Sequence, residues 1–189
     1  EVVAQDEYGI TLELYTDTFV TESLYVSGME YERLAVDDYV HGYTSDVGKP
    51  ELPLKGILID IPEGQIGALS ILQTTVETHS GYQIFPLPAN SVDDQGDAAA
   101  VAERFVIDSE AYSIDAFYPL SVAQLGDVFA FRDQNKQQLI FYPVAFNPVT
   151  GELNHYKRIR VRIDYVDDIF ARADNKSVSP WQVPAPSSG

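Results

Sequence analysis

The chain has 189 residues, of which 45% are hydrophobic and 12% aromatic, so it can build the core of one folded domain. Its 29 acidic and 12 basic side chains give a net charge of −17, which argues against binding to nucleic acid or to an anionic membrane surface. The absence of cysteine excludes disulfides, thiolate metal sites and a cysteine nucleophile in this chain, and it favours an exported protein.

Short segments with apolar residues at alternate positions run through most of the sequence, separated by Gly, Pro and Asn. In the first of these, Tyr8, Ile10, Leu12 and Leu14 would share one face of a half-buried strand. Strands are predicted at 8–16, 19–27, 29–36, 54–61, 66–78, 104–108, 128–132, 138–146 and 154–166. The pattern predicts an all-β fold, an antiparallel β-sandwich or a jelly roll.

Two segments lack a strand pattern. The first, 86–117, begins with Pro-Leu-Pro and contains only one short predicted strand, with an Ala-rich run at 97–104 that could form a helical turn or two. A connection of this length is usually functional or mobile. The second, 171–189, is rich in Pro and Ser and is interpreted as a linker, so the folded domain is expected to span 1–170. Because Glu1 is an unusual natural start, we expect the sequence to begin inside a larger protein.

No catalytic constellation can be identified. The three histidines, His41, His79 and His155, fall on different predicted elements and are interpreted as exposed or hydrogen-bonded structural residues. The sequence contains no Gly-x-Ser-x-Gly, no His-Glu-x-x-His and no phosphate-binding glycine loop. The acidic stretch 93–97 lacks the glutamate that would complete a calcium loop and is interpreted as solvated. We therefore predict no catalytic residue, no cofactor and no metal site.

One strand carries a concentration of positive charge on this acidic background. Lys157, Arg158, Arg160 and Arg162 lie within six positions, and the three arginines alternate with apolar residues, so they share one face. We expect them to form cross-strand ion pairs with acids such as Glu13. The alternative is a docking surface for an acidic partner.

Three motifs in order along the chain place proline, glycine and aromatic residues around predicted strands. The first consists of Gly48, Pro50, Leu52 and Pro53 before the strand at 54–61, which is closed by a Pro-Glu-Gly turn. Such residues fix the backbone at turns and strand ends, because proline restricts φ and glycine allows positive φ.

The second motif is Phe-Tyr-Pro, ending at Pro119, followed by a strand that ends in Phe-Ala-Phe-Arg at 129–132. The third is Pro-Val-Ala-Phe-Asn-Pro-Val-Thr-Gly-Glu-Leu, which includes Asn147, Pro148 and Gly151. In this order the three motifs resemble the N-terminal pro-region of the C25 family of cysteine peptidases, the gingipain-like enzymes. The resemblance covers roughly 8–166, which is most of the chain.

The resemblance implies a β-sandwich or jelly-roll domain, secreted or on the surface of a bacterium, that precedes a cysteine peptidase domain and binds it in cis. In such zymogens the pro-region assists folding and occludes the active site until proteolysis removes it, with a basic side chain as a substrate-like plug in Arg- or Lys-specific members. Arg104 is the candidate plug, because it is the only Lys or Arg between Lys55 and Arg132. An ordinary strand-end arginine remains the other interpretation. Arg172 and Lys176 in the predicted linker are candidate maturation sites.

Two other functions stay open on the sequence alone. The first is an extracellular binding or adhesion module that recognises carbohydrate or protein through some of its 12 tyrosines. The second is a structural domain of an exported complex. The sequence that follows Gly189 in the gene would distinguish them, because only the pro-region hypothesis requires a Cys/His peptidase domain there.

Overall fold

The computed structural model describes residues 1–35, 42–91, 102–132 and 134–168, which are almost entirely antiparallel strands. The strands are β1 (Val2–Asp6), β2 (Gly9–Tyr15), β3 (Val20–Val26), β4 (Met29–Ala35), β5 (Lys55–Ile61), β6 (Gln65–Ser80), β7 (Ala89–Ser91), β8 (Ala102–Arg104), β9 (Ala123–Phe131), β10 (Gln134–Phe141), β11 (Val144–Asn147) and β12 (Glu152–Asp167). A single 3-10 turn, η1 (Ala111–Ser113), is the only helical element in these ranges. No helix in the described ranges is long and apolar enough to cross a bilayer.

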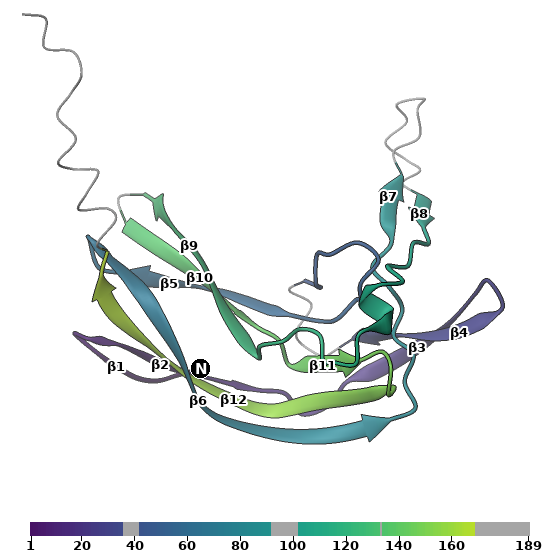
Figure 1. Cartoon of the computed structure of the whole chain (residues 1–189). Coiled ribbons are helices and arrows are strands. Elements are labelled where there is room, and N and C mark those ends of the chain that lie inside the picture. The colour runs from purple at the N-terminus through teal and green to yellow at the C-terminus, as the bar shows by residue number, and fades with distance from the viewer. Residues whose placement is uncertain (36–41, 92–101, 133, 169–189) are drawn as a thin grey trace, which may run out of the picture.

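The largest sheet is built around β12, one of two 16-residue strands. The other, β6, pairs with β12 along its whole length, from Glu152 opposite Ser80 to Asp167 opposite Gln65. The second edge of β12 is shared, because β11 pairs with its first residues and β2 with its later ones. Strand β1 extends the sheet beyond β2, which gives five strands in all (Figure 1).

A three-stranded sheet in the order β5-β10-β9 packs against one end of this large sheet, as the left half of Figure 1 shows. The core between them is made of aliphatic and aromatic side chains, namely Ile10, Leu12, Leu14, Ile59, Ile61, Ala123, Leu139, Phe141, Ile159, Val161 and Ile163. Alternate residues of β2 and β12 supply six of these eleven side chains, as the period of two in the sequence of both strands predicts. The predicted antiparallel β-sandwich is therefore confirmed.

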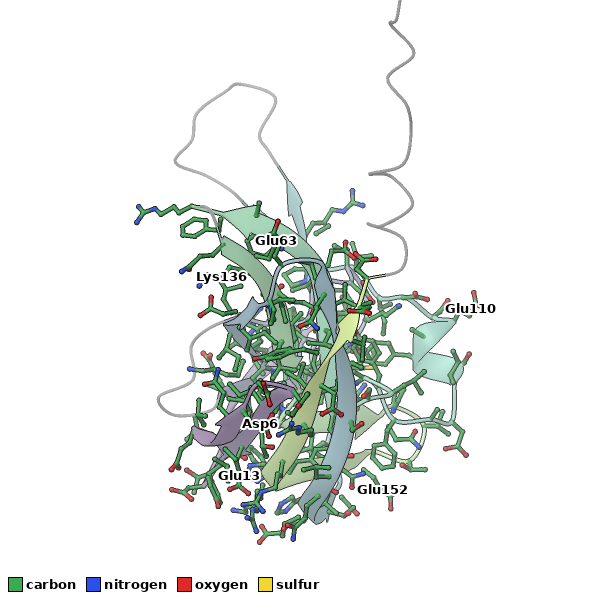
Figure 2. The ribbon with its side chains drawn as sticks, turned by 90° about the vertical axis from the view of Figure 1, so that its left-hand side faces the viewer. Asp6, Glu13, Glu63, Glu110, Lys136 and Glu152 are labelled. Atoms are coloured by element: carbon green, nitrogen blue, oxygen red, sulfur yellow. The ribbon has the colours of Figure 1, made fainter. Side chains whose placement is uncertain are left out.

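The other end of the molecule has a smaller core of its own. It contains six buried side chains, Leu34, Leu52, Ile84, Val144, Phe146 and Leu153, with Phe19, Tyr82, Tyr112 and Tyr118 packed around them. Two hairpins, β3–β4 and β7–β8, extend from this end (Figure 1). Acidic side chains such as Glu63, in the turn between β5 and β6, and Glu110, next to η1, are exposed (Figure 2).

Most predicted strands are present, but two strand predictions were wrong. The strand expected at 138–146 is two strands, because Pro143 has no N–H and the chain passes there from the smaller sheet to the larger one. The strand expected at 104–108 is absent, since β8 ends at Arg104 and Phe105 turns into a group of aromatic rings. Of the Ala-rich run that could form a helical turn or two, 102–104 is strand and 97–101 lies outside the described residues. Strands β1 and β7 were not predicted.

Candidate functional site

The hairpin β7–β8 projects from the body of the molecule and carries Arg104. Ala89 pairs with Arg104 and Ser91 with Ala102, and in the described part of the chain this hairpin pairs with no other strand (Figure 1). The Arg104 side chain is exposed. Among the residues whose side chains the structure describes, none forms an ion pair or a hydrogen bond with its guanidinium group.

Other described arginines have internal partners, so Arg104 differs from them. Arg33 pairs with Glu51 at 2.6 Å through its Nε, and Arg162 pairs with Asp6 at 2.9 Å through its Nη2. Arg132, which is also exposed, lies 5.4 Å from the centre of the Phe131 ring. Among the described arginines, Arg104 and Arg132 are thus the two that are exposed, and only Arg104 lies on the projecting hairpin.

The base of the hairpin is held by three aromatic rings. Phe105, which follows Arg104 directly, lies 5.6 Å from the ring of Tyr31 and 5.7 Å from that of Phe85, and these two rings are 6.0 Å apart. Tyr31 is fully buried. The guanidinium of Arg33 covers the Phe85 ring at 4.8 Å. The hairpin base is thus anchored one residue from an exposed arginine.

Backbone hydrogen bonds to the first motif hold both ends of the segment that contains the hairpin. Before β7, the Gly48 N–H donates to the Leu87 carbonyl at 2.9 Å and the Leu87 N–H donates to the Lys49 carbonyl at 2.8 Å. After β8, the Asp108 N–H donates to the Gly48 carbonyl at 2.9 Å. Gly48 has a φ of +83°, and a Cβ atom there would lie 2.9 Å from the Asp108 nitrogen. Glycine is required at this position for both reasons.

The remaining residues of the first motif fix the chain next to this glycine. Pro50 forms a bridge with Pro86, and Pro53 forms one with Tyr43. Leu52 is fully buried in the smaller core. The motif therefore acts as the support for the start of the 86–117 segment.

The chain that returns from β8 is also anchored. The Asp108 carboxylate accepts hydrogen bonds from the backbone N–H groups of Glu110 and Ala111 at 3.1 and 3.0 Å, which starts η1. The Tyr112 hydroxyl donates to the Ile84 carbonyl at 2.7 Å, and burial raises the pKa of this hydroxyl well above its usual range. The segment predicted to be irregular is thus bound to the body over its later half.

The third motif forms the turn between β11 and β12, and Pro148 lies in that turn. The buried Asn147 amide donates to the Asp115 carboxylate at 2.8 Å, and its side-chain oxygen accepts from the Val149 N–H at 3.0 Å. Gly151 has a φ of +67° and its N–H donates to the Asn147 carbonyl at 2.9 Å. In the second motif, Pro119 follows a cis peptide bond. These residues shape turns and loops.

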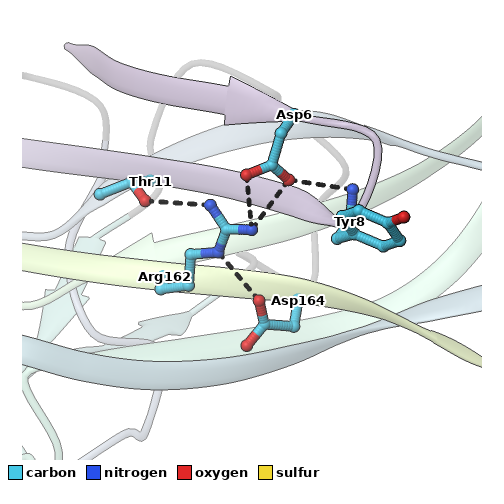
Figure 3. Close-up of polar contacts among 5 residues, drawn as sticks. All are labelled: Asp6, Tyr8, Thr11, Arg162 and Asp164. Carbon is cyan, nitrogen blue, oxygen red and sulfur yellow. Dashed lines mark hydrogen bonds and ion pairs between the residues drawn. The ribbon is translucent and has the colours of Figure 1, made fainter.

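The basic strand pairs internally, as expected. Arg158 and Arg160 both bind the Glu13 carboxylate, which lies on β2, and Arg158 lowers the pKa of Glu13 to about 2. Arg162 binds Asp6 from β1 and Asp164 from its own strand (Figure 3). All three arginines pair within the chain, so the structure favours this interpretation over a docking surface.

Two of the three histidines meet, which sequence reasoning missed. His79 on β6 and His155 on β12 lie beside Glu77, whereas His41 lies outside the described residues. Burial and the nearby Lys157 lower the pKa of His155 to about 4. Its ring bonds the Thr16 hydroxyl at 3.2 Å, but that hydroxyl is buried and donates to the Tyr156 carbonyl, so it is no nucleophile. No sequence signal predicts which residues of two distant strands face each other.

Three further candidates cannot be placed in space. Arg172, Lys176 and the acidic stretch 93–97 lie outside the described residues. They remain predictions from the sequence.

Comparison with known proteins identifies the family. The Propeptide_C25 family model matches residues 37–178. The chain belongs to this family. Local sequence similarity agrees, since 54 residues of this C25 propeptide, 29% of the chain, are 39% identical to Gingipain R2 and to Gingipain R1 of Porphyromonas gingivalis. The matched region spans 7% of the length of Gingipain R2 and 5% of that of Gingipain R1.

Two solved structures share the fold of this C25 propeptide. A complex of the RgpB pro- and mature domains of Porphyromonas gingivalis matches with a TM-score of 0.75 and 20% identity over 87% of this chain and 83% of that one. A structure that addresses the zymogenic latency of gingipain K from the same organism matches with a TM-score of 0.71 and 16% identity, over 88% and 91% of the two chains. The antiparallel β fold is therefore that of gingipain prodomains.

Proposed function

We propose that this domain inhibits a downstream gingipain-like cysteine peptidase by occluding its active-site cleft, assists its folding, and is removed by proteolysis. The observation that carries the proposal is an exposed arginine on a projecting hairpin whose base is anchored, in a chain of the Propeptide_C25 family. The family match favours this function over an adhesion module. We further propose that the parent zymogen is secreted or displayed on the cell surface of a bacterium.

The inhibitory mechanism rests on an arginine that is positioned before it binds. The Arg104 guanidinium would enter an acidic specificity pocket as a substrate side chain does, because its fork of N–H donors matches a carboxylate. Pairing with Ala89 and the packing of Phe105 order the backbone around Arg104 in advance, which lowers the entropy cost of binding. The same anchoring would keep the following peptide bond from adopting the geometry needed for cleavage.

Inhibition in trans tests the proposal. The whole chain, residues 1–189, is added to the catalytic domain encoded in the same gene, and hydrolysis of peptides with Arg or Lys before the scissile bond is measured. We expect stoichiometric inhibition that Arg104→Gln weakens by at least about tenfold, the loss of one desolvated charged hydrogen bond. Arg132→Gln is the matched control, since Arg132 is also exposed, and should inhibit as the parent chain does.

The possible outcomes distinguish inhibition by the domain as a whole from the specific role of Arg104 as the plug. Full peptidase activity at saturating chain would overturn the inhibitory function. Equal inhibition by the parent chain and Arg104→Gln would retain occlusion and reject Arg104 as the plug. For maturation, Arg172→Gln and Lys176→Gln should each be compared in the zymogen, and loss of processing in one of them would identify the site.

A further inference from the structure

Glu77, His79 and His155 come together on one face of the large sheet. In the register of β6 and β12, Glu77 is directly opposite His155 and Leu153 is opposite His79, so the three side chains lie on the same side of the sheet. One ligand atom from each lies within 4.8 Å of the other two. They line a surface pocket of about 300 Å³, together with Phe19 and others. The exposed carboxylate of Glu77 makes this pocket reachable from solvent.

Hydrogen bonding fixes the tautomer of His155. The Thr16 hydroxyl has one proton, which it donates to the Tyr156 carbonyl at 2.6 Å. In the hydrogen bond of 3.2 Å between this hydroxyl and His155 Nε2, the donor must therefore be the N–H of the imidazole. A neutral imidazole that donates from Nε2 carries its free lone pair on Nδ1. Metal-binding histidines are usually oriented in this way, with the second nitrogen donating to a neighbouring group.

His79 supplies an unpartnered buried nitrogen. Within the described residues its Nε2 is buried and has no hydrogen-bond partner. The Phe19 ring packs edge-on against both histidines, with centroid distances of 5.6 Å to His79 and 5.1 Å to His155. Buried polar atoms without a partner are rare and indicate a strained site or a missing ligand. Here the nitrogen lies among two other metal-ligating groups.

We propose that Glu77, His79 and His155 bind one Zn²⁺ ion, which would cross-link β6 to β12. Two imidazole nitrogens and one carboxylate oxygen are a zinc ligand set, with water as the fourth ligand, whereas Ca²⁺ and Mg²⁺ prefer oxygen ligands only. Bonds of about 2.1 Å in a tetrahedron place the ligand atoms about 3.4 Å apart. To reach this spacing from the 4.8 Å cluster, the exposed Glu77 side chain must rotate inward and leave its ion pair with Lys157.

Lys157 competes with the metal for Glu77. Its ammonium group lies 3.5 Å from the Glu77 carboxylate, at a bulge where β12 has one residue more than β6. The Glu77 side chain is 56% exposed and that of Lys157 is 30% exposed, so solvent weakens the pair and the carboxylate can exchange its partner for a doubly charged ion. Removal of Lys157 should therefore strengthen zinc binding, whereas removal of a metal ligand should weaken it.

Calorimetric titration of the whole chain with ZnCl₂ tests the proposal. The chain, free of any histidine tag, is stripped with a chelator and then titrated, and thermal unfolding is followed with and without the ion. We expect one Zn²⁺ per chain, a rise in Tm and no heat from CaCl₂ or MgCl₂. Glu77→Gln and His79→Gln should each weaken binding at least about tenfold, as the loss of a ligand requires. Glu30→Gln, another exposed strand glutamate, is the control and should bind as the parent does.

Two further variants make the result decisive. Lys157→Gln should bind Zn²⁺ several-fold more tightly. The proposal is overturned if the chain does not bind zinc or if His79→Gln binds it as the parent does. It is also overturned if His41→Gln loses binding while His79→Gln keeps it. Circular dichroism of each variant before titration separates loss of the site from loss of the fold. The titration uses this chain alone, so its outcome is independent of the proposed inhibition.

Discussion

The two ends of this molecule are built by different means. The sandwich end joins β2, β6 and β12 to β5, β9 and β10 through a continuous aliphatic core and long strand ladders. The hairpin end holds β7–β8 with three aromatic rings and a few backbone hydrogen bonds to Gly48 and Lys49. Arg104 therefore lies outside both hydrophobic cores, so a substitution of this candidate plug should leave the stability of the fold almost unchanged. Substitutions should therefore act differently at the two ends.

The largest effect is expected in the sandwich core. Leu139 is fully buried, so Leu139→Ala should lower the free energy of unfolding by about 2–5 kcal/mol through lost burial and the cavity left behind. Urea denaturation of the whole chain measures it. Leu120→Ala is the matched control, because Leu120 is 90% exposed, and should change stability by less than about 0.5 kcal/mol. Equal losses in the two variants would contradict the assignment of this core.

The next effect is expected at Gly48 in the hairpin support. Gly48→Ala places a Cβ 2.9 Å from the Asp108 nitrogen and imposes a φ of +83° on alanine, so it should cost about 2 kcal/mol or more. Gly64→Ala imposes a φ of +73° with nothing within 4 Å and should cost about 1 kcal/mol. Urea denaturation gives both values. Their difference measures the close approach alone, and equal values would show that the contact relaxes without cost.

A third substitution distinguishes the two ends most directly. Phe105→Ala removes one ring of the cluster with Tyr31 and Phe85, and should cost about 1–2 kcal/mol because Phe105 is only half-buried. Phe105→Ala should weaken inhibition of the cognate peptidase by a larger factor than Leu139→Ala does. Both variants are compared under conditions in which they are folded. The reverse order would show that the hairpin base does not position Arg104.

Much of the fold could be predicted from the sequence because long strands with one buried face carry a period of two. The residues around Val161 show this pattern in β12, and those around Leu12 alternate between apolar and polar in β2, where Thr11 and Glu13 on the second face are buried as well. Strands β7 and β8 have three residues each, too few to show any period. The inward turn of Phe105 depends on rings at 31 and 85, which are distant in sequence. Tertiary packing, not local preference, decides such elements.

Of the two candidate sites, one could be predicted from the sequence and the other could not. Arg104 could be selected by its isolation from other basic residues, a property that is visible in the sequence. The meeting of His79 and His155 could not, because it depends on the register between β6 and β12, where two irregularities shift the pairing. A shift of one residue would have placed the two rings on opposite faces.

The smallest expected effect concerns the pH dependence of the sandwich end. Hydrogen bonds from Arg158 lower the pKa of Glu13 from 4.5 to about 2 in the folded chain. A carboxyl whose pKa is depressed by folding stabilises the fold above its unfolded pKa and loses that contribution as the pH falls through its folded pKa. This contribution should therefore be complete above about pH 4.5 and decline toward pH 2. Glu13→Gln removes it, so the difference in urea midpoint between the parent and this variant should be largest near neutral pH and shrink as the pH falls. A difference that stays constant from neutral pH to about pH 2 would show that Glu13 acts through packing or hydrogen bonding and not through its charge.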